Sequence, residues 1–358
     1  MTDKTSFEIM HEFVPPARKK LSHGNWDYLM GAAETETTHK RNRLALDSLG
    51  FRPRVLRDVL EVDCGTEFLG HKLRLPIVLA PIGSMQDFVD GGGAIPTRAA
   101  ARFGCMHMLS SVCAPGPEEV AKAADHPKIF QIYVRGDAEW LDDLFAQALD
   151  LGYTAICLTV DLDYYGRRER DKAKRHKPTS QRHTVIHDHQ RRFSWADIER
   201  LRGKFDCPLI IKGIATAEDA IIAADTGVDV VYVSNHGGRQ LDYGLGSISV
   251  LRPIVEALDG RAQTIIDGAF MRGTDIVKAM ALGANAVGIG RLQGLAAAAA
   301  GEDGIVRMLE LLETEIEGTL GMLGVRSYGE LDPSYLADAP PIHQGASHPA
   351  FPLLDENY

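Results

Sequence analysis

The sequence around residue 236 reads Val230-Val231-Tyr232-Val233-Ser234-Asn235-His236-Gly237-Gly238-Arg239-Gln240-Leu241-Asp242. Its four uncharged residues at the start are typical of a short strand buried on both faces of a parallel sheet. The glycines allow the chain to turn and to approach a ligand closely. Histidine can accept a proton near neutral pH, and arginine binds a carboxylate with paired donors. A base beside an anion-binding group predicts an acidic substrate that loses a proton at the end of this strand.

Similar apolar runs recur along the chain, and each is followed by a helical pattern. The predicted strands are Pro76–Gly83, Met106–Ser111, Lys128–Val134, Ala155–Asp161, Pro208–Ile214, Val230–His236, Gln263–Gly268 and Ala286–Arg291. Predicted helices between them include Ala138–Leu151, Thr216–Thr226 and Thr274–Leu282. Thr216 is a predicted N-cap, because acids follow it in the first turn of its helix. Eight strands that alternate with helices predict an α/β fold of the (β/α)8 TIM barrel type.

Polar residues end nearly every predicted strand, and this pattern favours a barrel over an open sheet. These residues are Ser110, Gln131, Tyr133, Thr159, Asp161, Lys212, Ser234, His236, Asp267 and Arg291. In a barrel the carboxyl ends of all strands converge on one site, whereas in an open sheet they spread along a line. We therefore expect these side chains to surround a single pocket.

The regions outside the predicted strands suggest one domain over residues 1–358, with the barrel at 71–325. Residues 1–70 are predicted to form an N-terminal helical cap. The strongly polar segment 163–192 is predicted to be a mobile, solvated loop over the barrel mouth. The proline-rich tail 333–358 is predicted to be irregular.

Composition excludes several classes of protein. The 358 residues carry a net charge of −10, which argues against a nucleic-acid-binding protein. No apolar run is long enough to cross a membrane, and the first residues do not resemble a signal peptide. The five cysteines are odd in number and include no CxxC pair, so neither a disulfide framework nor a zinc site is expected. We expect a cytoplasmic protein without a metal, a membrane partner or a nucleic-acid partner.

Several blocks in the same order resemble the FMN-dependent 2-hydroxy acid oxidase and dehydrogenase family, which includes glycolate oxidase, lactate oxidase and mandelate dehydrogenase. They include Ser234–Asp242, Tyr165–Glu169, Leu158–Asp161 and Asp267–Gly273, and the resemblance covers roughly residues 15–330. It implies oxidation of an (S)-2-hydroxy acid to the 2-oxo acid, with electrons passing through FMN to oxygen or another acceptor. It also implies a homotetramer.

The resemblance assigns roles to the residues of the predicted pocket. His236 is the implied base, and Arg239 and Arg168 are the implied ligands of the substrate carboxylate. Two charge-assisted contacts of about 1.5–3 kcal/mol each are enough to orient a small acid. The other implied catalytic residues are Asp161 beside the histidine, Tyr133 at the substrate hydroxyl and Tyr28 at the carboxylate.

The same resemblance implies a cradle for FMN. Lys212 is the implied partner of the flavin ring near N1, where a buried lysine stabilises negative charge. Glycine-containing segments before helices are suited to bind the phosphate, although their spacing is not that of a dinucleotide-binding fingerprint. The implied cofactor-binding residues are Pro81, Ile82, Gly83, Ser110, Gln131, Thr159, Lys212, Ser234, Asp267, Gly268, Arg272, Gly290 and Arg291.

Four positions depart from the family pattern. Met271 stands where relatives often have the first of two arginines, so one phosphate contact is in doubt. The segment Asp90–Gly93 replaces a His-Pro-x-Gly-Glu block. Val112 stands where some oxidases have tryptophan, and Gly83 is smaller than the usual alanine. We expect the last two to open space for a substrate bulkier than glycolate, and Gly83 favours a dehydrogenase or monooxygenase slightly.

Two alternatives remain open at this stage. One is another flavin-dependent barrel enzyme with an isomerase-like activity. The other is a non-catalytic FMN-binding protein, which is suggested by Met271 and by the glycine-rich segment Asp90–Gly93. The sequence does not identify the hydroxy acid, the electron acceptor or the pathway.

Overall fold

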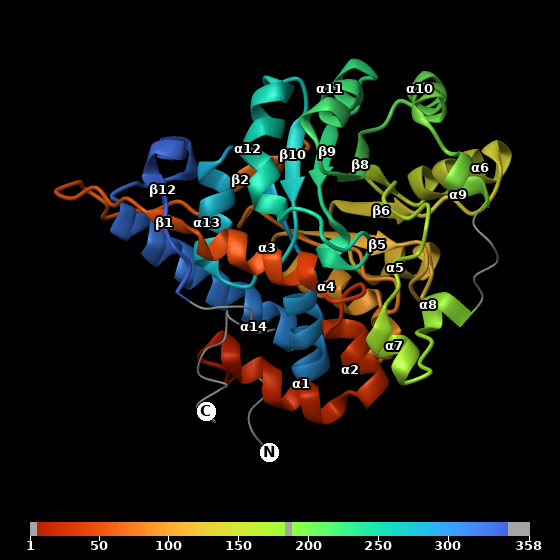
Figure 1. Ribbon diagram of the computed structural model, residues 1–358, viewed down its shortest axis with the longest axis horizontal. Helices are drawn as coiled ribbons and strands as arrows, with labels where there is room; N and C mark the ends of the chain where they lie inside the picture. Colours follow the sequence, from red (N-terminus) through yellow and green to blue (C-terminus); the bar gives the residue numbers. More distant parts are fainter. Residues whose placement is uncertain (1–5, 183–187, 343–358) are drawn as a thin grey trace.

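A computed structural model describes residues 6–182 and 188–342, and it contains a closed barrel of parallel strands (Figure 1). Each barrel strand pairs with its neighbours in the order β10-β11-β4-β5-β6-β7-β8-β9, and β9 closes the ring onto β10. The predicted TIM barrel is therefore confirmed. The barrel strands are β4 (Ile77–Leu79), β5 (Met106–Ser110), β6 (Lys128–Ile132), β7 (Ala155–Thr159), β8 (Leu209–Ile214), β9 (Val230–Val233), β10 (Gln263–Ile266) and β11 (Ala286–Ile289).

Helices follow the barrel strands and cover the outside of the ring. They are α4 (Ala94–Phe103), α5 (Pro117–Ala123), α6 (Ala138–Asp150), α10 (Trp195–Lys204), α11 (Ala217–Asp225), α12 (Ser247–Leu258), α13 (Gly273–Ala281) and α14 (Arg291–Leu323). The Thr216 hydroxyl accepts a hydrogen bond from the Asp219 amide at 3.2 Å, as expected for the N-cap of α11. Most strands end before their predicted limits, because the polar residues that follow them lie on loops.

Two separate cores follow from the alternation of side chains along each strand. One fills the barrel, where Val78, Cys157 and Tyr232 point inward. Phe68 and Leu73, from the hairpin of β2 (Thr66–Phe68) and β3 (His71–Leu73), join this interior core. The second core lies between the strands and the surrounding helices. The rigid ring thus holds the loops at its carboxyl end in fixed positions.

The N-terminal region is helical only in part. It contains η1 (Met10–Phe13), α1 (Val14–Lys20), α2 (His23–Met30) and α3 (Thr37–Asp47), followed by β1 (Leu49–Phe51). β1 pairs antiparallel with β12 (Leu336–Asp338). The prediction of an irregular tail is therefore wrong for its first part. The buried side chains of Tyr335 and Leu336 favour this pairing, which the sequence pattern alone did not reveal. Residues 343–358 of the predicted tail lie outside the described residues.

The segment predicted as a mobile, solvated loop contains short helices and buried side chains. These helices are α7 (Glu169–Ala173), α8 (Thr179–Arg182) and α9 (Asp188–Arg192). Arg168, Asp171 and Gln190 are buried, so part of the segment packs against the barrel and the cap. α7 lies beside α2 (Figure 1). Residues 183–187 of this predicted loop lie outside the described residues.

Candidate active site

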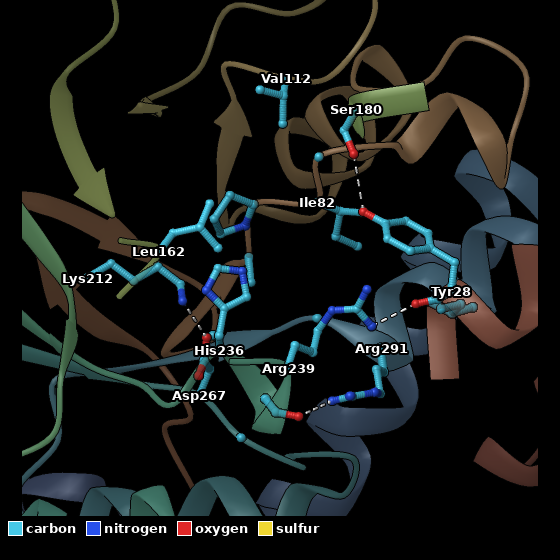
Figure 2. Close-up of a pocket in the computed structure, with 18 of the residues that line it drawn as sticks. Tyr28, Ile82, Val112, Leu162, Ser180, Lys212, His236, Arg239, Asp267 and Arg291 are labelled. Atoms are coloured by element: carbon cyan, nitrogen blue, oxygen red, sulfur yellow. Dashed lines mark hydrogen bonds and ion pairs between the residues drawn. The ribbon is translucent and has the colours of Figure 1, made fainter. Parts of the chain in front are cut away.

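A cavity of about 330 Å³ opens at the carboxyl end of the barrel (Figure 2). Thirteen residues that were predicted for the site line it. They are Tyr28, Pro81, Ile82, Gly83, Tyr133, Arg168, Lys212, His236, Arg239, Asp267, Gly268, Gly290 and Arg291. The predicted convergence of strand ends is observed in part. Of the strand-end residues expected around the pocket, Tyr133, Lys212, His236, Asp267 and Arg291 line it, whereas Ser110, Gln131, Thr159, Asp161 and Ser234 do not. Figure 2 shows Arg239 between His236 and Tyr28.

The His236 imidazole is held by a carboxylate that follows another strand of the barrel. Its Nδ1 lies 2.9 Å from Oδ1 of Asp161, which follows β7. The backbone of His236 has φ +57°, a left-handed conformation that is uncommon outside glycine. The His236 amide donates to the Ser234 hydroxyl at 3.0 Å, which stabilises this turn. Because Asp161 occupies Nδ1, the imidazole presents Nε2 to the cavity.

Opposing effects set the protonation of this pair. Burial lowers the pKa of His236 below its ordinary value of 6.5, and Lys212 and Arg168 lower it further, whereas Asp161 raises it. Burial raises the pKa of Asp161, but His236 and Lys212 reverse this effect and leave it below its ordinary value. At neutral pH the site therefore holds a neutral imidazole beside a carboxylate. That is the state required of a general base.

Tyr133 stands next to the imidazole. Its hydroxyl lies 3.4 Å from Nε2 of His236. Burial, the largest cause, and the nearby Asp161 raise the pKa of Tyr133, so the phenol keeps its proton. Tyr133 can therefore donate a hydrogen bond to an oxygen atom held beside His236.

Two arginines face the same side of the cavity and lack carboxylate partners. Within residues 6–182 and 188–342, neither Arg168 nor Arg239 forms an ion pair, and Nε of Arg168 has no hydrogen-bond partner. Arg239 donates to the carbonyls of Tyr28 and Gly31 at 2.7 and 2.9 Å. Its guanidinium carbon lies 4.8 Å from the Tyr28 ring centroid. The buried Asp171 carboxylate acts on both cations without forming an ion pair with either. Two buried cations with one nearby carboxylate indicate a site for a further anion.

Lys212 approaches the cavity from the strand before His236. Its Nζ donates to the Ser234 hydroxyl at 2.8 Å and lies 3.4 Å from Oδ2 of Asp267. The Ser234 hydroxyl donates in turn to Oδ1 of Asp267 at 2.6 Å. Burial lowers the pKa of Lys212, but Asp267 and Asp161 reverse this effect and leave it raised. The lysine is thus a fixed positive charge in the cavity.

A buried polar layer beside Lys212 suits the edge of a flavin ring. Gln131 is fully buried and donates to the Thr159 hydroxyl at 2.9 Å, but its own Oε1 has no partner among the described residues. Ser110 pairs with Gln131 in the ladder, and Thr159 pairs with Lys212. An unpaired buried acceptor is rare. The N–H groups and carbonyls of a flavin ring are able to satisfy these groups, so the residues fit FMN.

The start of α13 differs from the predicted phosphate-binding site. Arg272 does not line the cavity, because it forms an ion pair with Glu315 at 2.7 Å. The amides of Met271 and Arg272 donate to Asp275, and the Gly273 amide donates to Glu315. These N–H groups are therefore occupied. We had expected both helix starts to favour an anion, and at α13 this is wrong.

The start of α14 remains suited to the phosphate. Gly290 and Arg291 line the cavity there, and Met271 contributes an apolar side chain. The Arg291 guanidinium donates to the carbonyls of Gly237 and Gly31 at 2.9 Å. Burial, followed by the charge of Arg239, lowers the pKa of Arg291 to about 9. The negative charge of a phosphate bound nearby would raise the pKa of Arg291 and so oppose both effects.

The Val112 side chain occupies the space beside Gly83. A Cβ added at Gly83 would lie 2.7 Å from Cγ2 of Val112 and 3.5 Å from Cβ of Ser180. The volume that we expected these two residues to open is therefore partly filled. Ser180 and Gln181, on α8, also line the cavity. No sequence pattern pointed to them, because the segment around them is polar throughout.

Comparisons with known proteins agree with this geometry. The family model described as FMN-dependent dehydrogenase matches residues 17–338. The peroxisomal (S)-2-hydroxyacid oxidase of Arabidopsis thaliana is 37% identical over 332 residues, which cover 87% of this chain and 92% of the relative. Glycolate oxidase of Spinacia oleracea is 36% identical over 92% of this chain and 95% of its own. A mandelate oxidase structure shares 34% identity, with a TM-score of 0.87 over 94% of this chain and all of that chain.

The barrel and its site define a flavin-dependent oxidoreductase. The chain belongs to the FMN-dependent dehydrogenase family. The predictions of this family, of FMN and of an enzyme that oxidises a 2-hydroxy acid are confirmed. Neither the isomerase-like alternative nor the non-catalytic one is supported by the matched relatives. Within the described residues, no helix has the length and apolarity needed to span a membrane.

Proposed function

We propose that this enzyme oxidises an (S)-2-hydroxy acid to the 2-oxo acid, with Nε2 of His236 as the proton acceptor. The proposal is supported most strongly by one observation: a neutral imidazole, hydrogen-bonded to Asp161 at 2.9 Å, lies beside two arginines that form no ion pair among the described residues. Asp161 orients the ring and stabilises the imidazolium after proton transfer. FMN, when bound, accepts the two electrons that leave the substrate.

The substrate is oriented by its carboxylate. Arg168 and Arg239 bind the two oxygens, and the Tyr28 hydroxyl adds a third donor from the cap. Tyr133 donates to the substrate hydroxyl, which it places beside His236. Because these donors come from separate loops of a rigid ring, the substrate is held in one orientation relative to the base. Leu162 and Phe88 contribute apolar walls to the cavity, which exclude water from the transferred proton.

The substrate proposed here is bulkier than glycolate. Val112 in place of a larger aromatic residue supports this, although Val112 also fills the space above Gly83. A structural neighbour, mandelate oxidase, is described with 3,3-difluoro-2-hydroxy-3-phenylpropionic acid, at 34% identity and a TM-score of 0.86. Oxygen is the proposed electron acceptor, because several matched relatives are named oxidases.

The proposal is tested by mixing the yellow protein anaerobically with a panel of 2-hydroxy acids and then admitting air. We expect an (S)-acid to bleach the flavin absorbance, the (R)-acid to leave it unchanged and air to restore it with peroxide release. Preferred bleaching by glycolate would contradict the proposed size of the substrate. Slow recovery in air would instead indicate a quinone or protein acceptor.

We further propose a cytoplasmic homotetramer. The described cysteines are all free thiols, which is consistent with a reducing compartment. Two of the matched relatives are named peroxisomal, so the compartment needs a direct test. Light scattering on the purified protein measures the oligomeric state. Fractionation of the source cells identifies the compartment. A monomer, or recovery in an organelle fraction, would contradict the respective proposal.

A further inference from the structure

Arg135 is the only arginine that borders both the active-site cavity and a second cavity beside it, within the part of the chain that the structure describes. It lies between β6 and α6, two residues beyond Tyr133. The second cavity also has a volume of about 330 Å³, and its walls include Trp140 and Phe130. Neither the predicted site nor the roles derived above include this arginine.

Arg135 is exposed to solvent and contributes to the wall of the active-site cavity. Tyr133 and Arg135 both line the active-site cavity, whereas Val134 between them is buried on the other side. This alternation is that of an extended chain, in which every second side chain shares a face. At about 3.3 Å per residue, Arg135 lies roughly 6–7 Å further toward the mouth than Tyr133.

Among residues 6–182 and 188–342, the guanidinium of Arg135 forms neither a hydrogen bond nor an ion pair. Two other arginines at the mouth differ in this respect. Arg167 lies 3.2 Å from Glu169, and Arg191 lies 3.5 Å from Asp188. Desolvation is the first cause of a lowered pKa at Arg135, and no carboxylate is among the causes that oppose it. Because this exposed arginine lines the cavity without a carboxylate partner, it is able to bind an anionic group of a ligand there.

We propose that Arg135 binds a second carboxylate at the far end of the substrate, so that the preferred substrate is a 2-hydroxy dicarboxylic acid. The inference rests on the proposed function, because it takes the first carboxylate to lie between Arg168 and Arg239. Because Tyr133 is the proposed partner of the substrate hydroxyl, its separation from Arg135 suits an acid whose second carboxylate lies several bonds beyond the hydroxyl-bearing carbon. Glu118 and Glu119 on the wall of the second cavity disfavour an anion beyond Arg135.

The test compares two acids of nearly the same shape. In (S)-2-hydroxy-5-methylhexanoate an uncharged isopropyl group replaces the distal carboxylate of (S)-2-hydroxyglutarate. Anaerobic flavin reduction gives the dissociation constant and limiting rate for each acid, in the native enzyme and in Arg135→Gln. Calorimetric titration with 2-oxoglutarate gives an independent measure of binding. Arg167→Gln is the matched control, because that arginine lies at the mouth with a carboxylate partner.

We expect the native enzyme to bind the dicarboxylate roughly ten-fold or more tightly than the uncharged acid. Arg135→Gln should remove this preference and leave the constants of the uncharged acid unchanged, while Arg167→Gln should retain it. Equal binding of both acids by the native enzyme overturns the inference, as does an equal loss for both acids in Arg135→Gln. If the uncharged acid reduces the flavin without any charge preference, only this inference fails. If no 2-hydroxy acid reduces it, the proposed function fails as well.

Discussion

His236 combines a strained backbone with a tuned side chain. Its left-handed φ of +57° costs on the order of 1–3 kcal/mol, which the surrounding turn must offset. Gly238 is needed in this turn, because an added Cβ would lie 2.5 Å from the His39 amide nitrogen. The sequence predicted the base and its carboxylate from their residue types and from family resemblance. The structure adds that burial outweighs the effect of Asp161 on the pKa of His236, so that the imidazole is neutral.

The lowered pKa of His236 has a consequence for the pH profile. The second-order rate of anaerobic flavin reduction should rise with pH through a midpoint below 6.5 and be flat above it, because a neutral imidazole is required. Asp161→Asn should move the midpoint further toward acid, since the carboxylate raises the pKa of His236, and should also slow the reaction. Asp188→Asn, an exposed position, serves as the control. A profile without a low-pH limb between about pH 5 and 9 would argue against His236 as the base.

Gly83 and Val112 are expected to be coupled. Gly83→Ala places a methyl group 2.7 Å from Val112 Cγ2, so the side chain must shift and flavin reduction should slow. Val112→Ala in the same chain should restore the rate. A double-mutant cycle should give a coupling energy of about 0.5–3 kcal/mol.

The matched control for this pair is Gly116→Ala, because an added Cβ there has no neighbour within 4 Å. It should leave the reduction rate unchanged. Strictly additive effects of the changes at positions 83 and 112 would show that the two residues do not compete for space.

The contacts of some other residues could not be predicted from the sequence. Arg272 and Met271 are adjacent, and the motif alone assigned the phosphate contact to the arginine. In the structure Glu315, which is distant in sequence, pairs with Arg272 and accepts a hydrogen bond from the Gly273 amide. Such a long-range competitor cannot be deduced from local spacing. The same applies to Ser180, whose position depends on how the mouth segment packs.

At the scale of elements, the strands were predictable and the segments between them were less so. Each barrel strand is short, apolar and followed by polar residues, so its local pattern agrees with its final environment. β12 was missed because its partner β1 is almost the whole chain away. The helices of the mouth segment were missed because their sequence is polar throughout, and they depend on contacts with other parts of the chain.

α8 is tethered to the loop after β4 by a small set of polar contacts. Asp87 accepts from the Thr179 amide at 2.8 Å and from its hydroxyl at 2.5 Å. The Ser180 amide donates to the Ser84 hydroxyl at 3.0 Å. Because Ser180 lines the cavity and lies 3.5 Å from the Tyr28 hydroxyl, this tether positions one wall of the substrate site.

Asp87→Ala removes two of these contacts, each worth about 1.5–3 kcal/mol when the acceptor is charged. We expect faster hydrogen exchange at the amides of residues 179 and 180, together with a higher KM for the substrate. The rate of flavin reduction at saturating substrate should stay close to that of the native enzyme. Unchanged exchange at α8 would mean that the carboxylate does not hold the helix.

At the scale of the whole molecule, the cap and the barrel are joined by a buried ion pair. Arg43 on α3 lies 2.7 Å from Asp275 on α13, and both side chains are almost inaccessible to solvent. Asp275 also accepts from the amides of Met271 and Arg272. This one carboxylate therefore fixes both the docking of the cap and the turn beside the phosphate end.

Arg43→Ala leaves the Asp275 carboxylate buried without its partner, so the free energy of unfolding should fall by about 3–5 kcal/mol. Arg74→Ala breaks an exposed pair with Glu313 and should cost about 1 kcal/mol or less. Chemical denaturation measures both values. Equal losses in the two variants would contradict a special role for the buried pair.

The same pair predicts how stability depends on pH. Burial raises the pKa of Asp275, but Arg43 reverses this effect and leaves it below its ordinary value of 3.8. The folded state therefore binds this proton less readily than the unfolded chain. The stabilisation is complete above the ordinary pKa and is lost as pH falls through the lowered one.

The central claim, that His236 accepts the substrate proton while Arg168 and Arg239 hold the carboxylate, is tested most directly by His236→Asn under anaerobic conditions. The limiting rate of flavin reduction by the best (S)-2-hydroxy acid should fall about 10²–10⁴-fold, because proton acceptance by a placed base contributes that much. Flavin content and the affinity for the 2-oxo acid product should stay near the native values. A variant that reduces its flavin at the native rate would contradict the account.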